Sequence, residues 1–406
     1  MRRSHNAVAG VMPVDDVRQK SADGAQSSRA ISMRRALLAA IVILATVAPT
    51  ASRADSASFQ GLGFLSGYIG SQAFGLSSDG SVVVGKTTSS SYIYQAFRWT
   101  AAGGMVGLGY LSGDTYSGAN GVNADGSVVV GYSFYTSVKA IRWTAAGGMV
   151  ALGLPYSQAF GVNGDGSVVV GAGGSEAFRW TAASGIVALG RLSGYTFSIA
   201  YGVSADGSVV VGDSSSSGSG YDNVQAFRWT AASGMVGLGY LSGDTASVAY
   251  GVSADGSVMV GYSINNINQK PKAFRWTAAG GMVGLGYLSG DTASQALGVN
   301  ADGSVVVGAG GSEAFRWTAA QGMQSIQSLL TAACVNTAGW TLISATAVSG
   351  DGQTIVGYGR DPNGKDQAWI AHIAASSSPA SARTTSTATV RATLPGGTVT
   401  ARRRSG

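Results

Sequence analysis

Residues 202–212 have the sequence Gly-Val-Ser-Ala-Asp-Gly-Ser-Val-Val-Val-Gly. An Asp-Gly pair between two runs of β-favouring residues is a strong hairpin signal, because glycine accepts the positive φ that a tight turn requires. Close variants of this stretch occur seven times, with successive aspartates 40 to 49 residues apart. A period of this length is typical of one blade of a β-propeller and not of a helical repeat. The seven aspartates are Asp79, Asp125, Asp165, Asp206, Asp255, Asp302 and Asp351.

Each copy predicts four short strands. The second strand follows the Asp-Gly turn, the third contains a tryptophan, and the fourth follows an Ala-Ala-Gly-Gly turn or a variant of it. No stretch shows a sustained helical period, so the predicted class is all-β. In the fifth copy the four expected strands are residues 249–253, 257–263, 272–277 and 282–286.

The number of fourth strands indicates how the repeats close. The tryptophan strand occurs seven times, but a fourth strand follows only the first six, the last of them the divergent residues 323–329. The missing copy is at the other end of the chain, in residues 59–63. A seven-bladed β-propeller closed by this N-terminal strand would need that arrangement, since it leaves no open sheet edge. An open β-solenoid is the alternative architecture.

The third strand carries a repeated arginine. In Ala-Phe-Arg-Trp-Thr, residues 226–230, the alternation of a strand places Phe227 and Trp229 on one face and Arg228 on the other. We expect the aromatic face to pack between blades and the arginines to pair with turn aspartates or carbonyls of the next blade; a ring of arginines that binds an anion is the alternative. The arginines are Arg98, Arg142, Arg179, Arg228, Arg275 and Arg316.

The N-terminal segment predicts export. A basic Met33-Arg34-Arg35 precedes an apolar run over residues 36–48, and small residues around Ala54 follow. This is the pattern of a secretory signal peptide, with Met33 as the expected true start and cleavage after Ala54. The apolar run is shorter than the roughly 20 residues of a membrane-spanning helix, so no span is expected in the mature protein.

We therefore expect three regions. Residues 1–54 form the leader and signal peptide, residues 55–373 form the seven-repeat propeller, and residues 374–406 form a disordered tail rich in Ser, Thr and Arg. The predicted location is secreted, either extracellular or at the periplasm or cell surface, and a monomer is expected.

Composition argues against several functions. The chain has a net charge of +6, but residues 55–373 contain 13 Lys and Arg against 17 Asp and Glu, which argues against binding nucleic acid. The single cysteine, Cys334, excludes an internal disulfide and is expected to be a small buried hydrophobe. With two histidines, the sequence offers no catalytic triad and no predicted metal site. It predicts no catalytic residues, no cofactor and no enzyme.

These motifs resemble the bacterial extracellular repeat family named after a His-Ala-Phe triplet, the HAF repeats. The residues that carry the resemblance are 202–212, the Ala-Phe-Arg-Trp-Thr of 226–230 and the Gly-Trp-Thr-Leu of 339–342. The resemblance implies a secreted or autotransporter-like protein and no known activity or cofactor. It departs from the family at the histidine of the triplet, which is replaced by Gln95, Lys139, Glu176, Gln225, Lys272, Glu313 and Gln367.

The variable loops between second and third strands are the predicted interaction surface, because repeat proteins place such variation on the binding face. The predicted function is a non-catalytic binding or surface-interaction module for a protein or a saccharide. The alternatives are a passenger remnant of an autotransporter and a carbohydrate-active enzyme that would use loop acids such as Asp213, Asp222, Asp361 and Asp366. The predicted ligand-binding residues are Tyr92, Tyr94, Tyr135, Tyr221 and Asn266.

Overall fold

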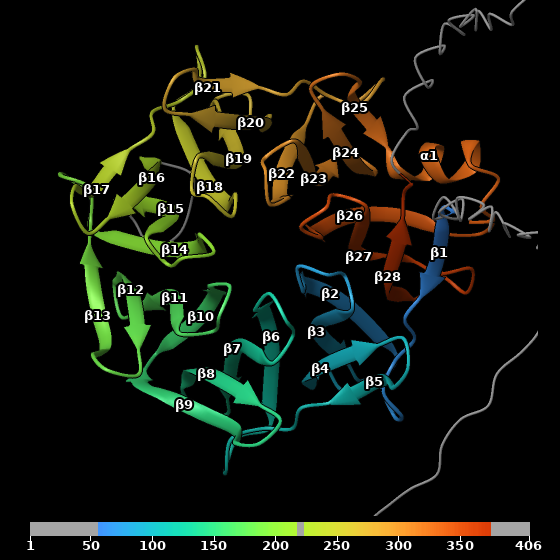
Figure 1. Ribbon diagram of the computed structural model, residues 1–406, viewed down its shortest axis with the longest axis horizontal. Helices are drawn as coiled ribbons and strands as arrows, with labels where there is room; N and C mark the ends of the chain where they lie inside the picture. The colour runs from blue at the N-terminus through green and yellow to red at the C-terminus, as the bar shows by residue number, and fades with distance from the viewer. Residues whose placement is uncertain (1–55, 217–222, 375–406) are drawn as a thin grey trace, which may run out of the picture. The chain divides into compact units, whose positions relative to one another are not determined.

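The computed structural model describes residues 56–216 and 223–374. They form seven four-stranded antiparallel sheets arranged around a central axis (Figure 1). This confirms the seven-bladed β-propeller. The predicted leader, and all but the first residue of the predicted tail, lie outside the described residues. The single helix among the described residues is too short to cross a membrane.

Each blade runs from an inner strand at the axis to an outer strand at the rim. Blade 1 consists of β2 (Gly70–Leu76), β3 (Val82–Thr88), β4 (Tyr94–Thr100) and β5 (Gly104–Gly107). Blade 2 consists of β6 (Tyr116–Val122), β7 (Val128–Phe134), β8 (Val138–Thr144) and β9 (Gly148–Pro155). Blade 3 consists of β10 (Ser157–Val162), β11 (Val168–Gly173), β12 (Glu176–Thr181) and β13 (Gly185–Gly190). Blade 4 consists of β14 (Phe197–Val203), β15 (Val209–Ser215), β16 (Val224–Thr230) and β17 (Gly234–Gly237). Blade 5 consists of β18 (Ala246–Val252), β19 (Val258–Ile264), β20 (Lys272–Thr277) and β21 (Gly281–Gly284). Blade 6 consists of β22 (Ser294–Val299), β23 (Val305–Gly310), β24 (Ala314–Thr318) and β25 (Gly322–Ser325).

The seventh blade combines both ends of the described chain. Its first three strands are β26 (Thr341–Val348), β27 (Thr354–Arg360) and β28 (Asp366–His372), and its outer strand is the N-terminal β1 (Ser58–Gly61). β1 pairs antiparallel with β28, with Ser58 opposite His372. The displaced strand therefore closes the ring as predicted.

The connections separate onto two faces of the ring. The Asp-Gly turns and the turns between third and fourth strands lie on one face, which we call the turn face. The connections between second and third strands, and those between blades, lie on the opposite face, which we call the loop face. The predicted variable loops therefore share one face.

The blades adhere through apolar contacts between their faces. Between blades 3 and 4, for example, Phe227 and Val210 of blade 4 pack against Val168, Val170 and Ala177 of blade 3. Burial of such side chains contributes about 1.5–3 kcal/mol each. The alternation in the third strand thus places Phe227 in the interface, as predicted.

The repeated arginines also join neighbouring blades. Arg98 donates to the carbonyl oxygen of Gly126 at 3.3 Å, and Arg275 donates to that of Gly303 at 3.2 Å. Each acceptor belongs to the Asp-Gly turn of the following blade. The structure therefore confirms blade-to-blade pairing with carbonyls at these positions.

A ring of backbone hydrogen bonds surrounds the axis at the turn face. The residue before each turn aspartate donates its N–H to the carbonyl of the equivalent residue in the next blade, with N···O distances of 2.8–3.2 Å. The seventh bond returns to the first blade, so the series has no end. Its members are Ser78, Ala124, Gly164, Ala205, Ala254, Ala301 and Gly350.

One segment departs from the all-β prediction. Residues 323–329 were expected to be a strand, but the strand ends at Ser325 and α1 (Ile326–Ala332) follows. The Ser325 side chain accepts a hydrogen bond from the Ser328 N–H and so caps the helix, while Ile326 and Leu330 bury one helical face. Four-residue spacing of two apolar residues is a helical signal too short to register as a period.

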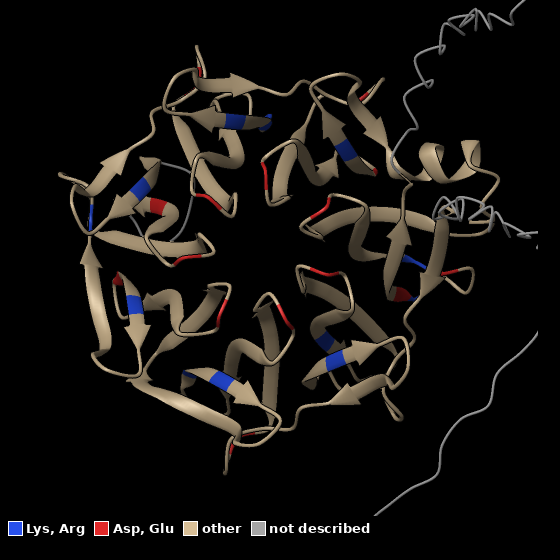
Figure 2. Ribbon diagram, in the orientation of Figure 1, with Lys and Arg blue, Asp and Glu red and all other residues tan. Residues whose placement is uncertain are grey.

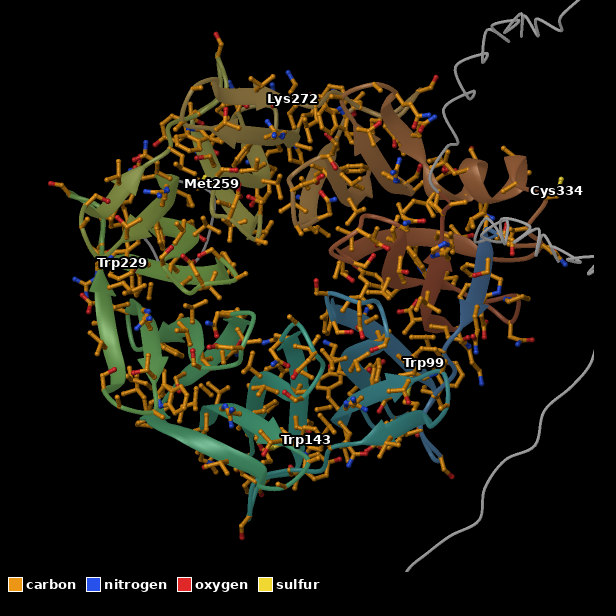
Figure 3. The ribbon with its side chains drawn as sticks, in the orientation of Figure 1. Trp99, Trp143, Trp229, Met259, Lys272 and Cys334 are labelled. Atoms are coloured by element: carbon orange, nitrogen blue, oxygen red, sulfur yellow. The ribbon has the colours of Figure 1, made fainter. Side chains whose placement is uncertain are left out.

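The expectation that Cys334 is buried is wrong. It is exposed beside α1 at the outer edge (Figure 3) and has a φ of 60°. Its N–H donates to the Thr331 carbonyl, and the next N–H, of Val335, donates to Leu330. This is the left-handed residue of a helix C-terminal motif, where glycine is usual, and the conformation directs the side chain to solvent.

Because glycines of the inner strands lie close to the backbone of the next blade, we expect their replacement by a larger residue to destabilise the ring. A Cβ atom on Gly161 of the inner strand β10 would lie 2.7 Å from the carbonyl oxygen of Tyr201 in the next blade. Because that neighbour is backbone, Gly161→Ala should lower the free energy of unfolding by about 1–3 kcal/mol. Gly103→Ser is the control, since Ser184 occupies the equivalent turn position in blade 3. Urea denaturation should place this control within about 0.5 kcal/mol of the natural chain; equal losses in the two variants would contradict the close approach.

Candidate functional site

Every inner strand contains a β-bulge at the same position. The register against the second strand shifts by one residue in each blade, and the extra residue faces the axis. Bulges redirect a side chain while the flanking ladder stays intact. These seven residues, which we call the bulge collar, line a cavity of about 400 Å³ together with Ser344 and Tyr358. The collar consists of Phe74, Asn120, Phe160, Tyr201, Tyr250, Leu297 and Thr346.

Two polar collar residues tie adjacent blades together. The Asn120 amide donates to the Ala159 carbonyl at 2.8 Å, and the Thr346 hydroxyl donates to the Ala73 carbonyl at 3.0 Å. The remaining collar residues are aromatic or aliphatic. The cavity wall is therefore of mixed character, with aromatic and aliphatic side chains beside several polar groups.

Behind the collar, the second strand of each blade contributes one variable residue. It pairs with the residue two positions before the bulge, for instance Lys86 with Gln72 and Asp213 with Ile199. The seven equivalent residues are Lys86, Tyr132, Ala172, Asp213, Tyr262, Ala309 and Tyr358. Only blade 1 and blade 4 carry a charge here, so charge at this position is not part of the repeat template.

Lys86 is a half-buried cation between aromatic rings. Its Nζ lies 4.8 Å from the centroid of the Tyr94 ring and 5.5 Å from that of the collar residue Phe74. Burial lowers the pKa of the Lys86 amine. Lys86 forms no ion pair with any residue in the described ranges. Its charge therefore lies near two aromatic rings, and no carboxylate of residues 56–216 or 223–374 is at ion-pair distance from it.

Lys86 lies in a pocket at the seam where the ring closes. This seam pocket, about 680 Å³ in volume, opens on the loop face between blades 1 and 7. Blade 7 contributes the loop between β27 and β28 and Asp366, the first residue of β28. The Asp366 carbonyl oxygen approaches Gly70 so closely that a Cβ atom added there would lie 3.3 Å from it. The lining residues are Ile69, Gly70, Ser71, Gln72, Lys86, Thr88, Ser89, Ser90, Tyr92, Tyr94, Arg360, Gly364, Lys365 and Asp366.

The seam pocket carries excess positive charge. Lys86, Arg360 and Lys365 face one acid, Asp366, and the Arg360–Asp366 pair is long at 3.9 Å with both side chains exposed. A long, exposed pair contributes little and is readily exchanged for another anion. Because residues 55–373 are net negative, this concentration of cations is a local feature.

The predicted binding residues separate into two groups. Tyr92 and Tyr94 both line the seam pocket, and Tyr92 is 74% exposed. Tyr135, 63% exposed, and Asn266 lie on the same face but in the loops of blades 2 and 5. Tyr221 lies outside the described residues. Of the four predicted residues that the structure describes, it thus brings two together.

The loop acids differ in environment. The carboxylate of Asp361 accepts hydrogen bonds from the N–H groups of Asn363 and Lys365, which is a turn-stabilising role, and Asp366 pairs with Arg360. Asp222 lies outside the described residues. Asp213 is 6% exposed, and burial raises its pKa to about 7, while hydrogen bonding from Tyr201 opposes the shift. Asp213 was expected in a loop, but the structure places it inside β15, where its side chain is buried.

Sequence reasoning missed Lys86 and the bulge collar. The bulge position is visible in the repeats as the variable residue before each Gly-Val, or before Gly-Leu and Ala-Val in the first and last copies. Its orientation toward the axis depends on an added residue in the ladder, which hydrophobic alternation does not predict. Lys86 could have been noticed as a charge where five other copies have Tyr or Ala.

Comparisons with solved structures bear on the fold. An oligogalacturonate lyase from Vibrio parahaemolyticus superposes with a TM-score of 0.52 at 10% identity, over 78% of this chain and 97% of the lyase. An oligogalacturonate lyase in complex with manganese gives 0.50 at 12% identity, over 73% and 87% of the two chains. A TolB from Acinetobacter baumannii gives 0.43 at 10% identity, and the match covers 73% of this chain and 65% of that TolB. No protein-family model and no curated protein matches the sequence.

The prediction that this protein is not an enzyme is wrong. It rested on the lack of a catalytic motif in the linear sequence, yet two lyases share this propeller fold. A propeller can assemble reactive groups from separate blades, so a missing local motif excludes nothing. At 10–12% identity the likeness shows the fold and assigns no reaction.

The raised pKa of Asp213 predicts a pH-dependent stability. The folded state holds a proton on Asp213 up to about pH 7, whereas the unfolded chain releases it near pH 4, so this group lowers stability progressively between those values. Asp213→Asn removes the ionisation. We expect the variant to exceed the natural chain in Tm by a few degrees at pH 8 and by much less at pH 4.

Asp206 is the control, because its pKa is lowered in the folded state whereas that of Asp213 is raised. Hydrogen bonds from Ser204 and Ser208 lower its pKa to about 2, so its ionised form stabilises the fold above pH 4. Asp206→Asn should therefore be less stable than the natural chain at pH 8. Thermal unfolding followed by circular dichroism from pH 4 to pH 8 measures both. A constant difference between Asp213→Asn and the natural chain would contradict the raised pKa.

Proposed function

We propose that this protein is an exported repeat protein, related to the HAF repeats, that binds a carboxylate-bearing saccharide in the seam pocket. The observation that carries the proposal is Lys86, a half-buried cation without a carboxylate partner in the described chain. An anion from outside the chain would supply the missing charge. A desolvated ammonium–carboxylate contact is stronger than a neutral hydrogen bond.

The other lining groups suit a sugar ring. Tyr92 and Tyr94 offer amphipathic aromatic surface, and Gln72, Ser89 and Ser90 offer hydroxyl and amide groups for hydrogen bonds. Arg360 and Lys365 provide further positive charge for a second acidic unit of an oligomer. An acidic oligosaccharide combines the ring faces, hydroxyls and carboxylates that these groups complement. Oligogalacturonate, named in the two lyase structures, is one compound of this class and serves as a probe.

The binding test uses paired ligands and paired variants. By isothermal titration calorimetry, digalacturonate and trigalacturonate should bind, while neutral galactose oligomers of the same length should bind at least about 10-fold more weakly. Lys86→Met should reduce the affinity for the acidic oligomers about 10- to 100-fold, the loss of one charge-assisted contact of about 1.5–3 kcal/mol. Methionine packs well between aromatic rings, so the variant should stay folded.

Lys272→Met is the matched control. Lys272 is in blade 5 and also lies over a tyrosine ring, with its Nζ 5.6 Å from the centroid of Tyr287. Its removal should leave the affinity unchanged. Equal binding of neutral and acidic oligomers, or unchanged binding by Lys86→Met, would refute the assignment. Competition by inorganic phosphate at equal affinity would indicate a general anion site instead.

Export has a separate test. The apolar run of residues 36–48 and the small residues before Ala54 support cleavage by signal peptidase. When the full chain is expressed in a bacterial host, N-terminal sequencing of the protein outside the cytoplasm should begin at Asp55. Recovery of only the uncleaved chain in the cytoplasm would contradict export and leave the pocket assignment unaffected.

A further inference from the structure

The bulge collar is aromatic on one side of the axis. In blades 3, 4 and 5 it presents Phe160, Tyr201 and Tyr250, with ring centroids 5.3 Å apart for the first pair and 5.0 Å for the second. The second-strand residue Tyr262 lies 5.9 Å from Tyr250. All three collar rings are partly exposed to the cavity. The rings are tilted to one another by 59° and 61°, and a wall of adjacent aromatic rings is the kind of surface that attracts a cation.

A buried carboxylate lies behind this wall. Asp213 is 6% exposed and interacts with Tyr201, and it forms no ion pair with any residue of the described ranges. A buried carboxylate is costly unless it is paired, so its presence at one copy of a repeated position calls for a reason. Among the equivalent positions, Ala172 and Ala309 show that the fold does not need an acid there.

The turn face adds a negative potential along the axis. Figure 2 shows acidic residues around the axis, with the arginines of the third strands farther out. These acids are the seven turn aspartates, and the pKa of the carboxyl is lowered in all of them. In six of them hydrogen bonds within the turn are the main cause. At Asp351 burial is the largest single effect and raises the pKa, but hydrogen bonds from Ser349 and Gln353 and the nearby His372 together outweigh it. All seven are therefore ionised at neutral pH. A closed ring of like charges focuses its field along the axis and favours cations there.

We propose that the bulge collar binds the ammonium group of a small organic cation, with Phe160, Tyr201 and Tyr250 facing the charge and Asp213 balancing it. This cavity is distinct from the seam pocket, and its proposed ligand is a cation, whereas the ligand proposed for the seam pocket is an anion. An alkylammonium is favoured over a metal ion because the wall offers π-faces and one shielded carboxylate, whereas hard cations require several oxygen ligands. The cavity of about 400 Å³ has room for an ammonium carrying several carbon substituents.

Choline and its neutral isostere, 3,3-dimethylbutan-1-ol, test the charge requirement. The two have the same shape at the quaternary centre and differ in charge. In titrations at pH 8, where Asp213 is ionised, choline should bind and the alcohol should bind at least 10-fold more weakly. Shifts of the tyrosine ring resonances in NMR spectra would report contact with the collar. Equal affinities would show an apolar cavity with no preference for cations and would overturn the proposal.

Two variants and a control test the assigned residues. Asp213→Asn keeps the size of the side chain and should weaken choline binding about 10-fold or more, and Tyr201→Leu should weaken it similarly while keeping apolar volume. Tyr135→Leu, in an exposed loop of blade 2, removes a tyrosine away from the collar and should have no effect. Circular dichroism verifies that each variant is folded. Unchanged choline affinity in a folded Asp213→Asn would overturn the role of this carboxylate.

Discussion

The closed ring of seven backbone hydrogen bonds at the turn face is the constraint on which the rest of the structure depends. Each bond joins an N–H in one blade to a C=O in the next, at 2.8–3.2 Å, and the seventh returns to the first. Because the series is closed, the N–H and the C=O of every member are both paired. The bonds also require the inner strands to approach at backbone distance, which is why Gly121, Gly161 and Gly202 follow the bulges. At these three positions an added Cβ atom would lie 2.7–2.8 Å from a backbone carbonyl oxygen of the next blade, so a larger residue would force the two strands apart.

The closing blade combines both ends of the described chain. Without β1 the outer edge of β28 would be unpaired, and β1 completes that blade. Ser71 strengthens this seam: it accepts a hydrogen bond from the Ala368 N–H and donates to the Gly63 carbonyl. Equivalent serines connect other blades, for example Ser198 with Ala177. The seam is thus built like the other blade interfaces, although its two sides are distant in sequence.

Much of the fold follows from the sequence because the repeat averages out local ambiguity. One Asp-Gly pair is weak evidence for a hairpin, but seven at a blade-length period, with residues 59–63 supplying the missing strand, predict the closed propeller. The two faces and the pairing of Arg98 and Arg275 with turn carbonyls also follow from the template. The incorrect predictions concern features that do not belong to the repeated unit. Helix α1 and Cys334 lie in the divergent connection before blade 7, where one copy alone carries the signal.

The candidate site was less predictable for a related reason. Tyr92 and Tyr94 were found because they lie in and directly after a variable loop, and Asp213 was found as a candidate acid although it lies inside β15 and not in a loop. Lys86 was missed because it lies inside β3, where the repeat template suggests a structural role. The significance of Lys86 and Asp213 appears only when strand register places them behind the collar, beside Phe74 and Tyr201 respectively.

The bulge separates structure from specificity within a single strand. Its neighbours keep the ladder and, in six of the seven blades, a glycine keeps the close approach of the backbones, while the bulge residue itself makes no ladder contact and is directed to the axis. Seven copies of the unit have therefore been able to place Phe, Asn, Tyr, Leu or Thr at this position with no change in the ring. Repetition fixes where the side chains point, and divergence among the copies decides what they bind. For this reason the residues that break the repeat, and not those that define it, are where ligand recognition is to be sought.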